Sequence, residues 1–188
     1  MNDTRQRLII AMTDALRRRG LHGSGLTELL AAADAPKGVM YHHFPGGKTE
    51  LAIAAIEATV ANLCAGLEKR LGNGDPAAAL VEWIAHAQKR LDASDYEHGC
   101  PLATIALETT NEDGAIRAAL AAGFAAIRER IAASLVLAGY ETQRADALAA
   151  LIVAAYEGGL LQARVAASTA PMALVSMALV SILNGAKK

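Results

Sequence analysis

The stretch from Ala35 to Glu50, Ala-Pro-Lys-Gly-Val-Met-Tyr-His-His-Phe-Pro-Gly-Gly-Lys-Thr-Glu, decides the fold of the first part of the chain. Asp34 and Pro36 indicate a helix start, because a short acidic side chain caps free N–H groups and proline has no N–H to satisfy. Pro45-Gly46-Gly47 indicates where the helix ends. The sequence therefore predicts a helix of about two turns from Pro36 to His43.

The two faces of this predicted helix differ in chemistry. A spacing of three and four residues places one set on the inner face: Val39, Met40, His43 and Phe44. The outer face carries the other set: Lys37, Gly38, Tyr41 and His42. A cation, a residue without a side chain, a phenol and an imidazole suit contact with phosphates and base edges. We interpret the stretch as a DNA-recognition helix. A purely structural amphipathic helix is the alternative, and it explains only the inner face.

Two more helices are predicted before the recognition helix. The first begins near Thr4, with a cap among residues 2–4, and ends at Arg17-Arg18-Arg19-Gly20. The second is capped by Ser24 and leaves Thr27 outside near its N-terminus, where a hydroxyl and free N–H groups can hold a phosphate. Their inner faces comprise Leu8, Ile9, Met12, Ala15 and Leu16, then Leu26, Leu29, Leu30 and Ala33. The arrangement predicts a helix-turn-helix.

The order Lys37-Gly38-x-x-Tyr41-x-His43-Phe44 resembles the recognition helix of the TetR family of bacterial transcriptional repressors, and the resemblance runs from Thr4 to Leu51. It implies a homodimeric repressor that a small-molecule inducer releases from a palindromic operator in double-stranded DNA, and the many Ala, Leu, Val and Ile residues of the later part of the chain favour a largely apolar inducer. The family usually has Phe where Arg17 stands, so packing there is expected to differ. Residues 99–103 and 157–164 resemble the ligand domain of the LmrA/YxaF-like branch.

Composition and spacing predict an all-α fold. The 188 residues provide ample material for a hydrophobic core, and no period-2 stretch indicates a strand. We expect an N-terminal helix-turn-helix DNA-binding domain over residues 1–47 and a C-terminal helical ligand-binding and dimerisation domain over residues 48–188. Helices of the second domain are predicted over about 48–71, 77–93, 102–109, 114–137, 141–167 and 171–184.

The charge distribution permits nucleic-acid binding at one end of the chain. The formal net charge is only -1. Residues 1–50, however, hold seven Lys or Arg against five Asp or Glu, and they hold three of the five histidines. The first quarter is therefore slightly basic, whereas the remainder is acidic.

No catalytic, metal or cofactor pattern stands out. Cys64 and Cys100 form no CxxC or Cys/His motif, which fits a reduced, cytoplasmic protein. Gly47-Lys48-Thr49 lacks the first glycine of a phosphate-binding loop, and the adjacent His42 and His43 diverge on a helix. An enzyme or carrier on a helical bundle is the rival interpretation, but its only support is Glu82 four residues before His86. We therefore expect no enzyme, no catalytic residue and no cofactor.

A membrane span is not expected. The uncharged run from Val165 to Ala186 is broken by Ser168-Thr169-Ala170-Pro171, and the remainder is shorter than the roughly 20 residues that a span requires. The apolar run from Leu8 to Met12 is too short for a signal peptide.

Three sets of site residues follow from the motifs and the resemblance. The expected DNA contacts are Thr27, Lys37, Gly38, Val39, Tyr41, His42, His43 and Lys48. For His43, packing under the helix and a DNA contact remain equal alternatives. The ligand pocket is expected to be lined by Leu63, Leu67, Trp83, Ile84, Ala87, Leu102, Ile105, Phe124 and Tyr156, with Tyr156, Gln162 and Glu108 as polar partners of the ligand.

The last two predicted helices are unusually apolar. Their stripes comprise Leu148, Leu151, Ile152, Ala155 and Gly159, then Leu174, Met177, Ala178, Ser181 and Ile182. Such faces in a soluble chain normally bury against a partner, and the family resemblance implies a four-helix bundle between two subunits. Burial within one subunit is the alternative. A helix-turn-helix used for protein contacts is the other alternative to DNA binding.

Overall fold

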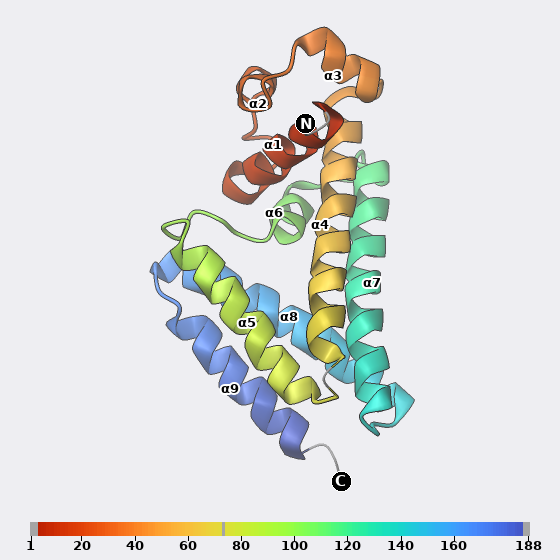
Figure 1. The fold of residues 1–188 in the computed structure, drawn as a ribbon, viewed down its shortest axis with the longest axis vertical. Coiled ribbons are helices and arrows are strands. Elements are labelled where there is room, and N and C mark those ends of the chain that lie inside the picture. The colour runs from red at the N-terminus through yellow and green to blue at the C-terminus, as the bar shows by residue number, and fades with distance from the viewer. Residues whose placement is uncertain (1–3, 73, 186–188) are drawn as a thin grey trace. The chain divides into compact units, whose positions relative to one another are not determined.

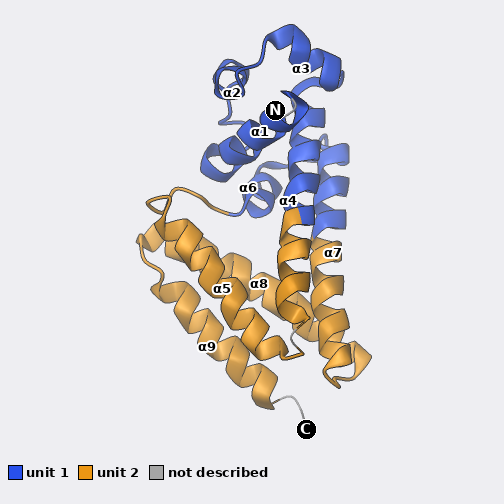
Figure 2. Cartoon of the chain, in the orientation of Figure 1, with its two compact units in different colours: residues 1–61, 100–123 blue, residues 62–99, 124–188 orange. Residues whose placement is uncertain are grey.

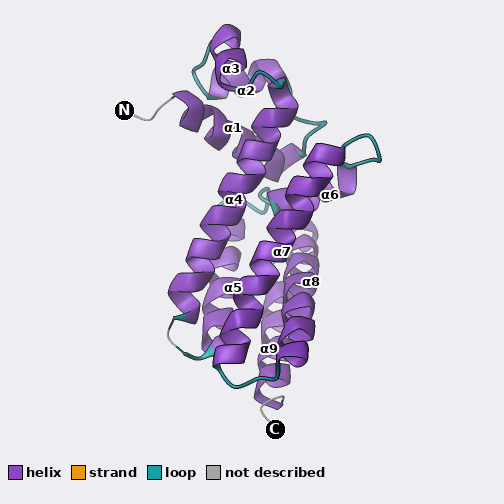
Figure 3. Ribbon diagram, turned by 90° about the vertical axis from the view of Figure 1, so that its right-hand side faces the viewer, coloured by secondary structure: helices purple, strands orange, loops and turns teal. Residues whose placement is uncertain are grey.

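The computed structural model describes residues 4–72 and 74–185. This part of the chain consists of α-helices joined by loops and contains no strand (Figures 1 and 3). The helices are α1 (Thr4–Arg19), α2 (Leu26–Ala32), α3 (Lys37–His43), α4 (Gly47–Leu71), α5 (Pro76–Asp92), α6 (Pro101–Glu108), α7 (Gly114–Leu137), α8 (Thr142–Ala166) and α9 (Ala170–Gly185). The predicted all-α class is confirmed, and the helix bounds agree to within one or two residues. Of residues 2–4, among which the first cap is expected, residues 2 and 3 lie outside the described residues.

The chain forms two compact units that do not follow a single cut in the sequence (Figure 2). Unit 1 comprises residues 1–61 and 100–123, and unit 2 comprises residues 62–99 and 124–188. Helix α6 therefore belongs to the same unit as α1, α2 and α3. The boundary expected at residue 47 concerns function, and it stays a prediction.

The core of unit 1 is built on α1. Leu8, Met12 and Leu16 are fully buried, as their spacing predicts, and α1 packs against α2, α3 and α6. From the other helices of the unit, Met40, Phe44, Leu51, Leu102 and Ile105 are also almost completely buried. The recognition helix is thus held from beneath by the same core that holds α6.

The start of α2 differs from the sequence prediction. Gly25 occupies the N-cap position and makes no side-chain cap. Ser24 is buried, and its hydroxyl donates to the carbonyl of Gly20 across 2.5 Å. A serine just before a helix can cap the helix or bond the preceding turn, and here it bonds the turn.

Unit 2 is organised by α5, α8 and α9, which pack against one another. Two long-range hydrogen bonds fix their ends, because the Tyr140 hydroxyl donates to the carbonyl of Leu183 across 2.7 Å and the Gln88 amide to that of Thr169 across 3.2 Å. Helix α8 begins with Glu141 as its N-cap and ends where Ala167 turns into the left-handed region, at φ 46°.

Two described helices, α4 and α8, are long and apolar enough to cross a membrane by length and composition alone. In each, 44% of the most apolar 18-residue window is buried inside the protein, as is common for core helices. The run from residue 165 onward is interrupted between Ala166 and Ala170, where the sequence predicts a break.

Candidate nucleic-acid interface

The turn between α2 and α3 ends one helix and aims the next. Asp34 lies in the left-handed region at φ 47°. Its N–H donates to the carbonyl of Ala31, and the N–H of Ala35 donates to the carbonyl of Leu30. This pattern is a Schellman motif, which satisfies the last carbonyls of α2. The prediction that Asp34 caps α3 is therefore wrong, and Pro36 is the N-cap, with no side-chain cap bond. Aspartate is among the residues that tolerate the left-handed region, so it serves the end of α2 instead.

Arg7 of α1 donates two hydrogen bonds to this turn. Its Nε donates to the carbonyl of Ala33 across 2.9 Å, and its Nη2 donates to the carbonyl of Asp34 across 3.0 Å. These carbonyls have no partner within the helix, so a forked guanidinium suits them well. Arg7 carries no local sequence signal for this contact, because its partners are 26 and 27 positions away.

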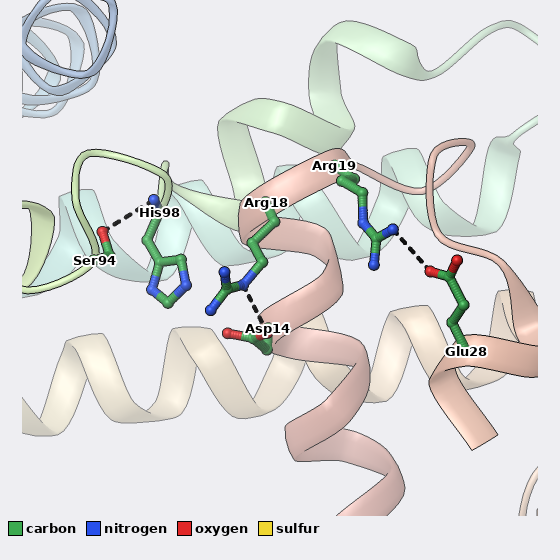
Figure 4. Close-up of polar contacts among 6 residues, drawn as sticks. All are labelled: Asp14, Arg18, Arg19, Glu28, Ser94 and His98. Atoms are coloured by element: carbon green, nitrogen blue, oxygen red, sulfur yellow. Dashed lines mark hydrogen bonds and ion pairs between the residues drawn. The ribbon is translucent and has the colours of Figure 1, made fainter. Parts of the chain in front are cut away.

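The other end of α2 is tied to α1 by an ion pair between Arg19 and Glu28, 2.7 Å apart (Figure 4). Figure 4 also shows Arg18 paired with Asp14 one turn earlier, at 3.0 Å. All four side chains are well exposed, and exposed pairs contribute only about 0–1 kcal/mol. The burial of α1 and the Arg7 contacts therefore do more to place α2 than these pairs do.

The polar face expected on α3 is exposed. Lys37, Gly38, Tyr41 and His42 are all accessible, whereas Met40 and Phe44 are buried. A Cβ placed on Gly38 would meet nothing within 4 Å, so the space beside this glycine is open. Two residues of the inner face, Val39 and His43, are only half-buried, and both alternatives for His43 stay open.

An open hollow lies along the junction of α2 and α3. It has a volume of about 480 Å³ and is lined by Thr27, Leu30, Ala31, Asp34, Ala35, Pro36 and Lys37. Thr27 and Lys37, which were expected at the phosphate backbone, thus border one concave surface. Thr27 is exposed at the first turn of α2, where backbone N–H groups are free.

Lys48 has a different environment from the other expected DNA contacts. It lies at the start of α4, and its ammonium donates to the carbonyl of Leu21 across 2.5 Å. Burial lowers the pKa of Lys48, and the carboxylate of Glu108 opposes that shift. The side chain therefore holds the turn between α1 and α2, and a contact between Lys48 and DNA stays a prediction.

The residues expected to line a ligand pocket are divided between the units. Leu102 and Ile105 belong to unit 1, where both are buried. Ile84 and Ala87 are buried in unit 2, whereas Leu63 and Phe124 are half-buried there. Spacing along a helix shows which residues turn inward, but it does not show which of two neighbouring cores receives them.

Three of the expected residues do come together in unit 2. The rings of Trp83 and Tyr156 stack, with centroids 4.0 Å apart and planes at 8°. Trp83 and Leu67 also line an apolar cavity, together with Leu71, Pro76, Ala79, Leu80, Ile131, Leu135, Ile152 and Leu183. The cavity offers about 20 Å³ to the centre of a water molecule, so it holds about one water-sized group as it stands.

The outward faces of α8 and α9 agree only in part with the expected dimer residues. Leu151, Leu174, Met177, Ala178, Ser181 and Ile182 are exposed, and Ala155 is half-buried. In contrast, Leu148, Ile152 and Gly159 are buried within the subunit, and a Cβ on Gly159 would lie 3.1 Å from Val175. These three pack within unit 2, and their place in a dimer interface stays a prediction. Leu161 and Val165 of α8 are exposed instead, and the sequence analysis did not include them.

Within residues 4–72 and 74–185, no three His, Cys, Asp or Glu side chains gather in a way that could hold a metal ion. Cys64 and Cys100 are both buried and free of disulfides. Burial raises the pKa of the Cys64 thiol.

Comparisons with known proteins agree with this geometry. Residues 76–178 match the family model described as the C-terminal domain of LmrA/YxaF-like transcriptional regulators. An uncharacterised HTH-type transcriptional regulator of Mycobacterium tuberculosis is 30% identical, over 97% of this chain and 95% of its own length. The HTH-type transcriptional regulator LmrA of Bacillus subtilis is 25% identical, over 97% of each chain. The crystal structure of a TetR regulatory protein from Rhodobacter sphaeroides superposes with a TM-score of 0.84 at 26% identity, over 94% of this chain and 96% of that one.

Proposed function

Because the chain belongs to the TetR family of DNA-binding transcriptional regulators, in its LmrA/YxaF-like branch, we propose that it is a repressor that a small, largely apolar molecule releases from its operator. The observation that carries the proposal is the exposed face of α3. Lys37, Tyr41 and His42 project from a helix whose opposite side is buried, and Arg7 fixes the turn before it. A short helix this well supported offers rigid side chains to a groove of DNA.

The DNA contacts divide by chemistry. Lys37 and Thr27 border the hollow between α2 and α3 and suit phosphate oxygens, which position the protein without reading sequence. Tyr41 and His42, which are exposed, suit the base edges, and the accessible part of the half-buried Val39 suits a thymine methyl. Gly38 has open space beside it, which allows the backbone to approach the DNA closely.

The active species is a homodimer. Leu174 and Met177 of α9 are 67% and 70% exposed, and Leu161 and Val165 of α8 are also exposed, which is costly for one subunit alone in water. A second copy covers such faces by two-fold symmetry, and a two-fold dimer reads a palindromic operator with half-sites about one helical turn apart. Such a regulator works in the cytoplasm, where the chromosome lies.

The ligand acts through unit 2. The stacked rings of Trp83 and Tyr156 and the apolar cavity beside Trp83 favour an apolar compound. A cavity of about 20 Å³ is far smaller than the roughly 300–1,000 Å³ of typical ligand sites, so binding requires side chains to move. A ligand that prefers the opened arrangement shifts the conformational equilibrium, and DNA binding changes by linkage.

The experiment is a fluorescence-anisotropy titration with the duplex that lies upstream of the protein's own reading frame, followed by transcription from that duplex in vitro. We expect saturable binding that weakens steeply with salt, and reduced transcription that an apolar compound restores. Binding with increased transcription would contradict the repressor role. Absence of binding to this duplex and to a random-sequence pool would contradict operator recognition.

A further inference from the structure

Glu108, the last residue of α6, accepts two hydrogen bonds from the turn between α1 and α2. Its Oε2 lies 2.6 Å from the backbone nitrogen of Leu21 and 3.1 Å from that of His22. The contacts join residues 86 and 87 positions apart within unit 1. A carboxylate that accepts two consecutive backbone N–H groups forms charge-assisted bonds, which are stronger than neutral ones.

The surroundings of Glu108 are built for this contact. Gly20 has φ 73°, and a Cβ placed on it would overlap the carboxylate of Glu108, so the turn approaches closely only because a glycine stands there. Lys48 donates to the carbonyl of Leu21 from the other side, so cation and carboxylate hold opposite ends of one residue's backbone. We call Glu108, Lys48 and the turn from Gly20 to His22 the turn clamp.

The turn clamp controls the segment that leads into the helix-turn-helix. Four residues after Leu21 lies Gly25, the N-cap of α2, and Thr27 follows in the first helical turn. The position of α6 itself is fixed by Leu102 and Ile105, which are fully buried in the core of unit 1. The position of α6 therefore restrains the turn before α2 through the carboxylate of Glu108.

We propose that Glu108 is a positioning residue for DNA binding: it makes no contact with DNA, and it holds the turn between α1 and α2 so that α2 and α3 present their polar faces together. The proposal rests on DNA binding by the family, and it does not depend on repression or on release by a ligand. It assigns a role in the DNA-binding unit to a residue inside the segment that matches the C-terminal domain model.

The test compares three substitutions of Glu108 in the full chain. Glu108→Gln keeps an oxygen that can accept both N–H groups, Glu108→Asp keeps the charge but retracts the carboxylate by one methylene, and Glu108→Ala removes both properties. Glu112→Ala is the matched control, because Glu112 is an exposed carboxylate four residues further along. The readouts are amide hydrogen exchange at Leu21 and His22, and affinity for a duplex selected by the wild-type protein from a random-sequence pool.

We expect Glu108→Ala and Glu108→Asp to accelerate exchange at both amides and to weaken duplex binding at least about tenfold. Glu108→Gln should stay within about threefold of the wild-type protein, and Glu112→Ala should match it. The slope of log affinity against log salt should be unchanged in every variant, because no phosphate contact is lost. We expect Glu108→Gln to bind the duplex more tightly than Glu108→Asp, because only the longer side chain reaches both N–H groups. This comparison tests the proposal even if the alanine variant does not fold.

A Glu108→Asp variant with the affinity and the amide exchange rates of the wild-type protein would overturn the proposal, because its carboxylate is one methylene too short for the contact. Faster exchange at Leu21 and His22 with wild-type affinity would equally overturn it. A wild-type protein that selects no duplex would instead contradict the proposed function, and the exchange measurements would still report whether the turn clamp exists in solution.

Discussion

Arg7 donates a hydrogen bond across 3.0 Å to the carbonyl of Asp34, 27 positions later, and so closes the turn that aims the recognition helix. Lysine cannot reproduce the forked contact with the carbonyls of Ala33 and Asp34, because it carries its charge on a single nitrogen. We expect Arg7→Lys to lower the free energy of unfolding by about 1–3 kcal/mol and to weaken operator binding. Urea denaturation and anisotropy titration measure the two effects.

Arg18→Lys is the control for this substitution. Arg18 is exposed and forms an ion pair with Asp14 one turn earlier on the same helix, so its replacement should change the free energy of unfolding by less than about 0.5 kcal/mol. Equal destabilisation by the two substitutions would show that the guanidinium of Arg7 has no special role in the turn.

Lys37 and Tyr41 are expected to contact DNA directly. Both are exposed on α3, so Lys37→Ala and Tyr41→Ala should each preserve the helical circular dichroism while weakening operator binding at least about tenfold. Loss of a phosphate contact at Lys37 should also reduce the slope of log affinity against log salt by about one, whereas Lys69→Ala, an exposed site at the end of α4, should not. An unchanged slope for Lys37→Ala would place this lysine away from the phosphates.

The helices of this protein could be predicted from its sequence because their signals are local. Pro36, the Pro45-Gly46-Gly47 run and the periodic leucines act within one or two turns, and the bounds of α1 and α3 follow from them. Asp34 shows the limit, because the same side chain is favoured both as a helix cap and in the left-handed region.

The contacts that position the site could not be predicted, because they depend on which distant segments meet. Glu108 and Leu21 lie 87 positions apart, and no pattern in either segment predicts that the two residues make contact. Similarly, the stripe with Leu148 and Ile152 was correctly recognised as apolar, but its periodicity does not tell whether a helix of the same subunit or of a second copy covers it.

The exposed residues of α9 are expected to form the dimer. Met177→Glu places a charge on a residue that is 70% exposed, so the subunit should still fold while the dimer dissociates at micromolar concentration. Leu137→Glu is the control, because Leu137 is 90% exposed at the end of α7 and is not among the expected dimer residues. Sedimentation velocity distinguishes the species. A wild-type monomer, or equal dissociation by both substitutions, would argue against an α8 and α9 interface.

The single tryptophan provides a reporter for the ligand. Trp83 stacks on Tyr156 and borders the cavity of unit 2, so an apolar compound that raises the melting temperature by binding there should change its fluorescence emission. Tyr156→Phe keeps the ring and should retain affinity within about threefold, whereas Tyr156→Ala should weaken binding about tenfold or more. Tyr96→Phe, elsewhere in the same unit, should have no effect. A stabilising compound that leaves the emission unchanged would bind at another place.

The acid sensitivity of α8 follows from its cap. Backbone N–H groups of Gln143 and Arg144 donate to the Glu141 carboxylate and hold its pKa below the usual value of a glutamate carboxyl. A carboxyl pKa that is lower in the folded state stabilises the fold above the unfolded pKa, and this stabilisation is lost as pH falls through the folded pKa. Glu141→Gln should therefore lower the melting temperature at about pH 7, and the difference from wild type should shrink below about pH 4. A difference that is constant over this range would show that the charge of the cap contributes nothing.

The chain passes from one compact unit to the other at residues 61–62, 99–100 and 123–124, so an N-terminal fragment alone is not expected to fold as unit 1 does. A fragment that ends within α4 would lack α6, which packs against α1, and it would therefore also lack Glu108. The same holds for chimaeras between relatives, because a head exchanged at residue 47 would bring a foreign turn against the native Glu108 and Lys48. Chimaeras between relatives are therefore expected to bind DNA with the specificity of the donor only when α6 is exchanged together with the N-terminal helices. Residues 100–123 would then have to be inherited together with residues 1–61 for a DNA specificity to be kept.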